Sequence, residues 1–385
     1  MYEISLKEEW RIKYEPLACH PLLADINGDG HPETVFITRE NKLKVYDACG
    51  EPVAMSRLPK SRVTTKHFID VVDFPPRIPS VSSCSITTPH GPESRIMGIF
   101  PDGTLAMYTN DARLQWNKRL RSGRVSSPLF VKEGSDEHII VAAGDNIQSL
   151  DPFGNVRWSV NAKGPVSSDL SLWESTDATF MLGGTVDNTI FSIGLNGNKL
   201  WESSIDGVAT APPLALKDSG MNSGNAGVST AIITPTTERV LSLITSSGEV
   251  VGSTSLPGLC MDAIAPISLG EKNILALGLT SPDMPLAAFA ENKITPLTRH
   301  GAGIRSRPVP FSLDTSRYLA YASMDWSLFI FDLGSFTPHP TRFKRYAMQG
   351  PITHAPQVFA YDSSFMVLLV ENDDTLVMLK GEQNT

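Results

Sequence analysis

Long apolar runs are missing from this chain of 385 residues. No stretch approaches the roughly 20 apolar residues that a helix needs to cross a bilayer, and the opening residues MYEISLKEEWRIKYE contain no apolar signal core. We therefore expect neither membrane insertion nor export. The formal net charge of −8 also argues against nucleic acid as a partner, because binding a phosphate backbone requires a basic surface.

Cysteine is scarce and scattered. The four cysteines show no C-x-x-C spacing: Cys19, Cys49, Cys84 and Cys260. This pattern favours reduced, mostly structural thiols over a disulfide framework. The chain also has no N-x-[ST] sequon for glycosylation. Together these absences predict a cytoplasmic protein.

Catalytic motifs are absent as well. The sequence contains no G-x-S-x-G elbow, no H-E-x-x-H zinc motif, no Walker loop and no G-x-G-x-x-G fingerprint. The eight histidines are dispersed along the chain. We predict that the protein is not an enzyme.

What the chain does contain is a repeat of short β-rich segments, measured by its tryptophans. Trp116, Trp158 and Trp201 follow one another at intervals of 42 and 43 residues. Long apolar stripes with helical spacing are missing, which argues against an α-solenoid. A period of this length filled with short strands is typical of β-propeller blades.

The repeat predicts one all-β domain over residues 1–385, an eight-bladed β-propeller of four-stranded antiparallel blades, with seven blades as the alternative. Residues 8–12 match the outer strands around the other tryptophans, so we expect residues 1–16 to complete the last blade and remove an open sheet edge. Two segments rich in Pro, Ser or Gly are expected to be exposed loop insertions. The predicted segments are blades at 20–58, 62–120, 124–161, 164–206, 207–257, 258–299, 303–346 and from 350 onward, with insertions at 74–94 and 217–229.

The segment DPFGNVRW at residues 151–158 resembles the D-x-x-G-x-x-x-W outer-strand motif of the pyrroloquinoline-quinone-type (quinoprotein dehydrogenase-like) propeller superfamily. The resemblance implies the propeller fold over nearly the whole chain and implies that the tryptophans pack between neighbouring blades. The copies beginning at Asp47 and Thr245 keep the glycine but not the tryptophan. The tryptophans concerned are Trp10, Trp116, Trp158 and Trp201.

The resemblance does not extend to the cofactor. Many quinoprotein dehydrogenases are longer, exported, and carry an adjacent cysteine pair near the quinone, whereas no two cysteines are adjacent here. No pyrroloquinoline quinone is therefore expected. Bacterial outer-membrane assembly lipoproteins of the same fold are scaffolds and match this chain better in size, although their signal peptide and lipobox cysteine are missing here.

An acidic loop occupies residues 25–33, DINGDGHPE. Oxygen-bearing side chains alternate along it, and Gly30 allows a sharp turn, so the loop could wrap a hard cation such as Ca²⁺. It resembles the calcium loops of FG-GAP (integrin α-type) repeats, which implies a structural calcium site. The alternative is a metal-free turn held by side chain to backbone hydrogen bonds. The implied ligands are Asp25, Asn27, Asp29, His31 through its carbonyl, and Glu33.

Polar and basic residues recur where the inner strands are expected to begin. Because these positions converge on the channel of a propeller, they could form a ring that binds an anion or an acidic peptide. The alternative is a solvated mouth with ordinary surface ion pairs. The residues are His20, Arg124, Arg305, Arg307 and His354.

We interpret the chain as a non-enzymatic propeller scaffold that binds protein partners within a larger assembly. Its rigid loops would lower the ordering cost of binding. Two alternatives remain open: a quinoprotein-like oxidoreductase or other propeller enzyme with a site in the channel, and an extracellular calcium-dependent propeller for adhesion or glycan binding.

Overall fold

The computed structural model describes residues 3–58, 81–88, 91–120, 125–174, 179–217, 222–223, 226–227, 230–269, 272–290, 293–298, 302–334, 343–361 and 363–384. These residues form β-strands and no helix, so no helical segment among them could cross a bilayer. The chain divides into two compact units. We refer to residues 12–170 as the N-terminal unit, and to residues 1–11 with 171–385 as the C-terminal unit.

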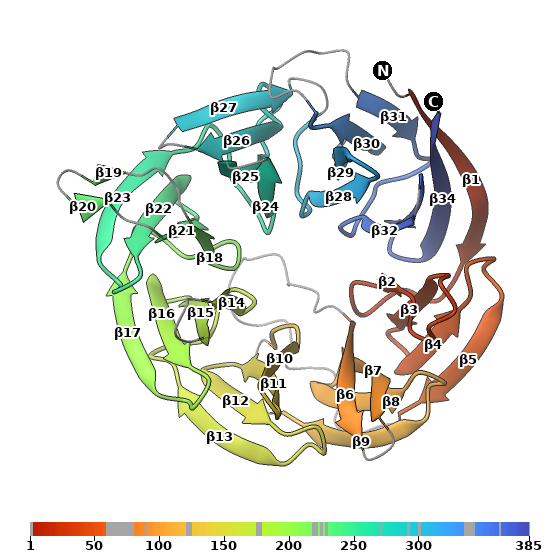
Figure 1. The fold of residues 1–385 in the computed structure, drawn as a ribbon, viewed down its shortest axis with the longest axis horizontal. Coiled ribbons are helices and arrows are strands. Elements are labelled where there is room, and N and C mark those ends of the chain that lie inside the picture. The colour runs from red at the N-terminus through yellow and green to blue at the C-terminus, as the bar shows by residue number, and fades with distance from the viewer. Residues whose placement is uncertain are drawn as a thin grey trace. The chain divides into compact units, whose positions relative to one another are not determined.

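The N-terminal unit contains three four-stranded antiparallel sheets, called blades 1 to 3 (Figure 1). In each blade the strands pair in chain order, so the blades are meanders joined by short turns. The strands are β2 (Leu22–Ala24), β3 (Glu33–Ile37), β4 (Lys42–Tyr46), β5 (Pro52–Arg57); β6 (Ser82–Thr88), β7 (Gly91–Ile99), β8 (Thr104–Thr109), β9 (Leu114–Arg119); and β10 (Leu129–Glu133), β11 (Asp136–Ala143), β12 (Asn146–Leu150), β13 (Val156–Asn161).

The C-terminal unit contains five more such sheets, blades 4 to 8. The last is completed by the N-terminal strand β1 (Glu3–Lys13), which pairs with β34. The other strands are β14 (Ser171–Glu174), β15 (Thr179–Thr185), β16 (Thr189–Gly194), β17 (Lys199–Ser204); β18 (Leu214–Lys217), β21 (Thr230–Pro235), β22 (Val240–Thr245), β23 (Val250–Ser255); β24 (Ile264–Leu269), β25 (Lys272–Gly278), β26 (Leu286–Ala290), β27 (Lys293–Thr298); β28 (Val309–Leu313), β29 (Ser316–Ser323), β30 (Ser327–Asp332), β31 (Phe343–Ala347); and β32 (Gln357–Tyr361), β33 (Ser364–Glu371), β34 (Thr375–Asn384).

Eight four-stranded blades confirm the predicted eight-bladed class, and the pairing of β1 with β34 confirms that the N-terminal strand completes the last blade. The strand ends at Lys13 and not at residue 16. Glu15 lies on blade 1 instead, where the Nζ atoms of Lys42 and Lys44 donate to its carboxylate at 2.6 and 2.9 Å. These two bonds lower the pKa of Glu15 to about 2.

Strand position within a blade sets the hydrophobic pattern. The second and third strands are buried on both faces and read as continuous apolar runs, as in TVFI of β3 and TIFSI of β16. The outer strands β5, β9 and β13 instead share one alternating pattern of exposed and half-buried residues. The core of each unit therefore lies between the middle strands of neighbouring blades.

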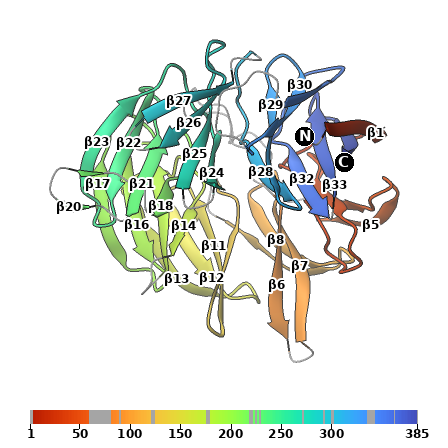
Figure 2. The same cartoon turned by 45° about the horizontal axis from the view of Figure 1, so that its top comes forward.

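The expected loop at 74–94 needs correction. Residues 82–88 and 91–94 belong to the paired strands β6 and β7, which form a long hairpin (Figure 2), while 74–80 and 89–90 lie outside the described residues. The insertion at 217–229 does lie between two strands of blade 5, β18 and β21, and contains a small hairpin of β19 (Asn222–Ser223) and β20 (Ala226–Gly227). Its other residues beyond Lys217 are outside the described ranges.

In blades 1 and 3 a D-x-x-G segment forms the turn before the outer strand. In blade 3 the Asp151 carboxylate accepts the N–H groups of Phe153 and Asn155, and the Gly154 N–H donates to the Asp151 carbonyl. Glycine is favoured because the fourth residue has a left-handed φ, 84° at Gly154 and 90° at Gly248. Blade 2 has the same turn with Ala112 at φ 61°.

Two outer-strand tryptophans contact this turn of the next blade. Trp116 of blade 2 donates its Nε1–H to the Pro152 carbonyl of blade 3 at 2.8 Å. Trp201 of blade 4 donates to Ser246 of blade 5 at 3.0 Å. Both indoles are half-buried. For this pair the predicted packing between blades is confirmed, at the rim of the interface and not in its core.

Candidate interaction surface

The acidic loop of blade 1 connects β2 and β3 and is held by its own hydrogen bonds. The Asp25 carboxylate accepts the N–H groups of Gly28 and Gly30 at 2.6 and 2.9 Å. Asp29 accepts the His31 N–H at 2.8 Å, which lowers the pKa of the Asp29 carboxyl. This is the pattern of a turn in which Asx side chains bond to nearby backbone.

Glu33 closes the loop from its buried end. Its carboxylate is 4% exposed and accepts the Ile26 N–H at 2.9 Å. Burial raises the pKa of Glu33. The Asn27 amide nitrogen donates to both Glu33 and Asp29, each at 2.9 Å, so it lies between the two carboxylates. A cation between them would have to displace this amide group.

Among the described residues no group of three or more His, Cys, Asp or Glu side chains is placed to hold a metal ion. The calcium site stays a prediction. A site would raise the free energy of unfolding by about 2.7 kcal/mol at a calcium concentration a hundredfold above Kd. Asp29→Asn would remove that gain. Unchanged unfolding on calcium addition would establish the loop as a hydrogen-bonded turn.

The hydrogen bonds of the loop make a separate prediction. Glu33→Ala leaves the buried Ile26 N–H without its acceptor, so we expect a loss of about 2–3 kcal/mol in the free energy of unfolding. Asp29→Ala, in an exposed position, is the matched control and should cost less than about 1 kcal/mol. Urea denaturation followed by tryptophan fluorescence measures both variants. Equal losses would contradict the importance of the buried bond.

The residues predicted for a channel mouth differ in burial. Arg305 and Arg307 are exposed in the segment that leads into β28, whereas His354 is fully buried, with its Nδ1 2.9 Å from Thr353 Oγ1. His20 belongs to the N-terminal unit and is half-buried. Arg124 lies outside the described residues. Of the residues of this set that the structure describes, Arg305 and Arg307 are the two exposed ones.

A second recurring turn joins the second and third strands of a blade. Its last residue has a left-handed φ, and in five blades the carbonyl of that residue accepts the N–H of the residue that follows the outer strand. Small or polar residues, or one arginine, occupy this position in four of the blades. The five residues are Asn41, Gly103, Asn188, Arg239 and Trp326.

Trp326 of blade 7 is the one aromatic residue among these five. Its φ is 62°, a region that costs a residue other than glycine about 1–2 kcal/mol and that bulky side chains rarely adopt. Its side chain is also 49% exposed, and Met324 of the same turn is 42% exposed. The turn forms as readily with Asn41 or Asn188 in other blades. Strain and exposure at one residue are typical of a functional position.

The turn is firmly anchored. The Trp326 N–H donates to Ser323, and the Met348 N–H donates to the Trp326 carbonyl at 2.8 Å. Arg345 on β31 bonds through Nε to Ser327 Oγ at 2.9 Å and through Nη2 to Asp325 at 3.2 Å. The exposed indole is thus presented on a fixed backbone, which lowers the entropy cost of binding a partner.

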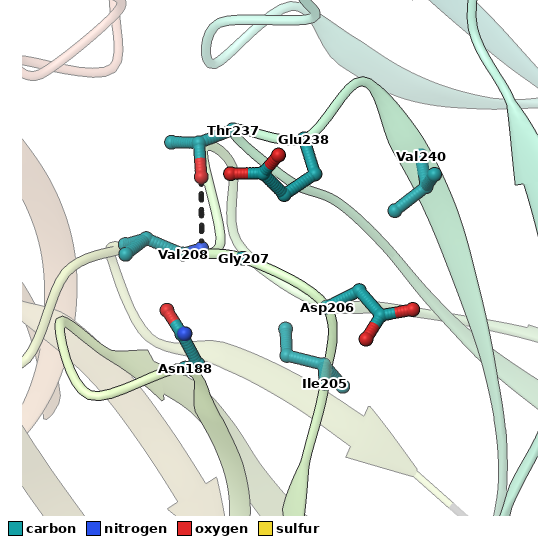
Figure 3. A pocket seen from close by; sticks show the side chains of 8 residues that line it. All are labelled: Asn188, Ile205, Asp206, Gly207, Val208, Thr237, Glu238 and Val240. Carbon is teal, nitrogen blue, oxygen red and sulfur yellow. Dashed lines mark hydrogen bonds between the residues drawn. The ribbon is translucent and has the colours of Figure 1, made fainter.

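A polar pocket of about 610 Å³ lies between blades 4 and 5 (Figure 3). Glu238 and Asp206 supply its carboxylates, and the Val208 N–H donates to Thr237 Oγ1 at 3.0 Å. The lining contains these two carboxylates but no histidine, cysteine or lysine.

No protein-family model matches the chain, and no curated protein matches it. Solved structures, in contrast, do match the chain. BBS1N in complex with ARL6DN matches with a TM-score of 0.55 and 11% identity over 97% of this chain and 96% of that one. BamB from Moraxella catarrhalis matches with a TM-score of 0.58 and 14% identity over 97% of each chain. At such identities the likeness shows the fold alone, the eight-bladed β-propeller.

Sequence reasoning missed Trp326 because the tryptophan spacing drew attention to the outer strands. The sequence nevertheless contained a signal for this residue. Aligning SMDWS at 323–327 with TRENK at 38–42 places a tryptophan where the repeat has asparagine.

Proposed function

We propose that this chain is a non-enzymatic β-propeller that binds a protein partner, as a subunit of a larger assembly, through the turn that carries Met324 and Trp326. The observation that carries the proposal is Trp326, an exposed indole held at a left-handed φ that the fold does not require. Tryptophan is among the residues most enriched at binding hot spots. Exposed aromatic and methionine side chains are typical of interface centres.

The structural neighbours support the same class of function. BBS1N was crystallised in complex with ARL6DN, so a propeller of this fold binds a protein partner in that case. The four free cysteines suit a reducing compartment such as the cytoplasm. Burial raises the pKa of Cys19 and Cys260 to about 12, which makes both thiols unreactive.

The variant Trp326→Asn tests the proposal, because asparagine already occupies this position in blades 1 and 4. Relief of the strained φ offsets the lost packing of the indole, so stability should change by less than about 1 kcal/mol. Binding should fall by about tenfold or more, as expected for a hot-spot residue. Affinity purification of tagged protein from native cells, with quantitative mass spectrometry, measures the partners retained.

Phe153→Ser is the matched control. Phe153 is 76% exposed, more than Trp326, and lies at an ordinary φ in a D-x-x-G turn. We expect this variant to retain every stoichiometric partner. The same partners on Trp326→Asn as on the unaltered protein would refute the proposed surface.

A further inference from the structure

A basic segment lies against the Trp326 turn. The Met324 N–H donates to the Gly303 carbonyl at 2.9 Å, and the Ala302 N–H donates to Ser323 Oγ at 3.1 Å. Arg305 follows Gly303 by two residues, so their Cα atoms are at most roughly 7 Å apart. The segment that carries the exposed Arg305 and Arg307 is therefore fixed beside the exposed Met324 and Trp326.

The charge of this surface contrasts with the chain as a whole. Arg305 and Arg307 are exposed in the segment beside the turn, and the carboxylate of the turn itself, Asp325, pairs with Arg345 of β31 at 3.2 Å. Within the part of the chain that the structure describes, Arg305 and Arg307 form no ion pair and no side-chain hydrogen bond. The full chain carries a formal charge of −8.

From this placement, and resting on the proposed function, the geometry points to the chemistry of the partner: an acidic peptide segment that also carries a large apolar side chain. The apolar side chain packs on Trp326 and Met324, where the burial of an indole supplies most of the affinity. Carboxylates of the same segment pair with Arg305 and Arg307. Arginine suits this role because its planar group binds a carboxylate through two parallel hydrogen bonds.

The two contributions differ in their salt dependence. Exposed ion pairs weaken as salt is added, since charges in water are screened over about 10 Å at 0.1 M ionic strength. Packing on the indole is not weakened in this way. Binding should therefore fall as salt rises, and the slope should depend on the two arginines and not on Trp326.

Three short synthetic peptides test the inference by fluorescence anisotropy with the full chain. The first has Asp and Glu around one Phe; the second replaces the acidic residues by Lys; the third replaces the Phe by Ser. We expect the first to bind at least about tenfold more tightly than either of the others. Arg305→Glu with Arg307→Glu should reverse this preference in favour of the Lys peptide, and any residual binding of the acidic peptide should rise and not fall with salt, because the added carboxylates repel it.

Arg113→Glu with Arg119→Glu is the charge-matched control. Both arginines are exposed on blade 2, in the other unit, and the net charge changes by the same amount. Equal affinity of the acidic and Lys peptides, absence of binding to the acidic peptide, or equal losses in the two double variants would overturn the inference.

The proposed function and the inference of an acidic partner can fail independently of each other. If Trp326→Asn loses its native partners while the arginine double variant keeps them, the interaction surface stands and its preference for an acidic partner is wrong. If both variants keep their partners, the surface itself is wrong.

Discussion

Replacing Arg11 by methionine should lower the free energy of unfolding by about 3–4 kcal/mol. Arg11 lies on β1, where its guanidinium pairs with the Glu371 carboxylate of β33 and, at 3.0 Å, with Glu8. The Glu371 side chain is only 4% exposed and also accepts the Gly350 N–H. Removing the arginine leaves a buried carboxylate without its counter-charge, which is among the most destabilising single changes.

The Arg11 network also fixes the N-terminal strand to the last blade. Tyr346 of blade 7 donates its hydroxyl to Glu8 at 3.1 Å, so three sequence-distant strands meet at one carboxylate cluster. The hydrogen bond from Arg11 lowers the pKa of Glu8. A carboxyl group whose pKa is lowered by folding stabilises the folded state at pH values above its ordinary pKa. This stabilisation is lost as the pH falls through the pKa of the folded state. The deficit of Arg11→Met should therefore shrink in acid.

Urea denaturation at neutral and acidic pH measures this effect. Lys7→Ala on the same strand, 80% exposed, should cost less than about 0.5 kcal/mol. Adding Glu371→Gln to Arg11→Met should recover part of the loss, because the buried charge is then gone. A deficit that is independent of pH, or no recovery in the double variant, would contradict the assignment.

The fold was predictable because its information is local and repeated. Alternating outer strands, apolar middle strands and turn residues recur along the chain, so a period read from Trp116, Trp158 and Trp201 located the eight blades. The match between 8–12 and the other outer strands also placed β1 correctly. The prediction of strands failed at β6 and β7, where the repeat pattern is missing. The β6–β7 hairpin lay in a Pro- and Ser-rich segment and was taken for a loop.

The candidate site was less predictable because it depends on backbone conformation and on tertiary neighbours. Sequence alone does not show that Trp326 adopts a left-handed φ, or that the Gly303 segment contacts its turn. His354 was expected at a solvated mouth and is buried, since its surroundings come from β33 and the turn that follows it. The sequence identified Arg305 and Arg307 as candidate binding residues. It did not identify Trp326, which lies on the turn beside their segment.

Gly248→Ala should cost about 3 kcal/mol or more. Gly248 has φ 90°, where alanine is strained by about 1–2 kcal/mol. A Cβ atom built there lies 2.6 Å from the Cδ2 atom of Trp201, well inside van der Waals contact. The indole cannot simply retreat, because its Nε1–H is bonded to the Ser246 carbonyl of the same turn. The variant should therefore separate Trp201 from blade 5 and break that bond.

Gly134→Ala separates the cost of backbone strain from the cost of the contact with the indole. Gly134 also has a positive φ, 62°, but a Cβ atom there meets nothing within 4 Å. Its loss should be confined to the backbone strain, so the difference between the two variants measures the contact with the indole. Gly154→Ala, whose Cβ would lie 2.9 Å from Trp116, should resemble Gly248→Ala, because the same packing recurs between blades 2 and 3. Equal losses for Gly248→Ala and Gly134→Ala would show that the glycine is required by the turn alone. The D-x-x-G and Trp positions of the repeat would then be independent features, and not the two halves of one contact between blades.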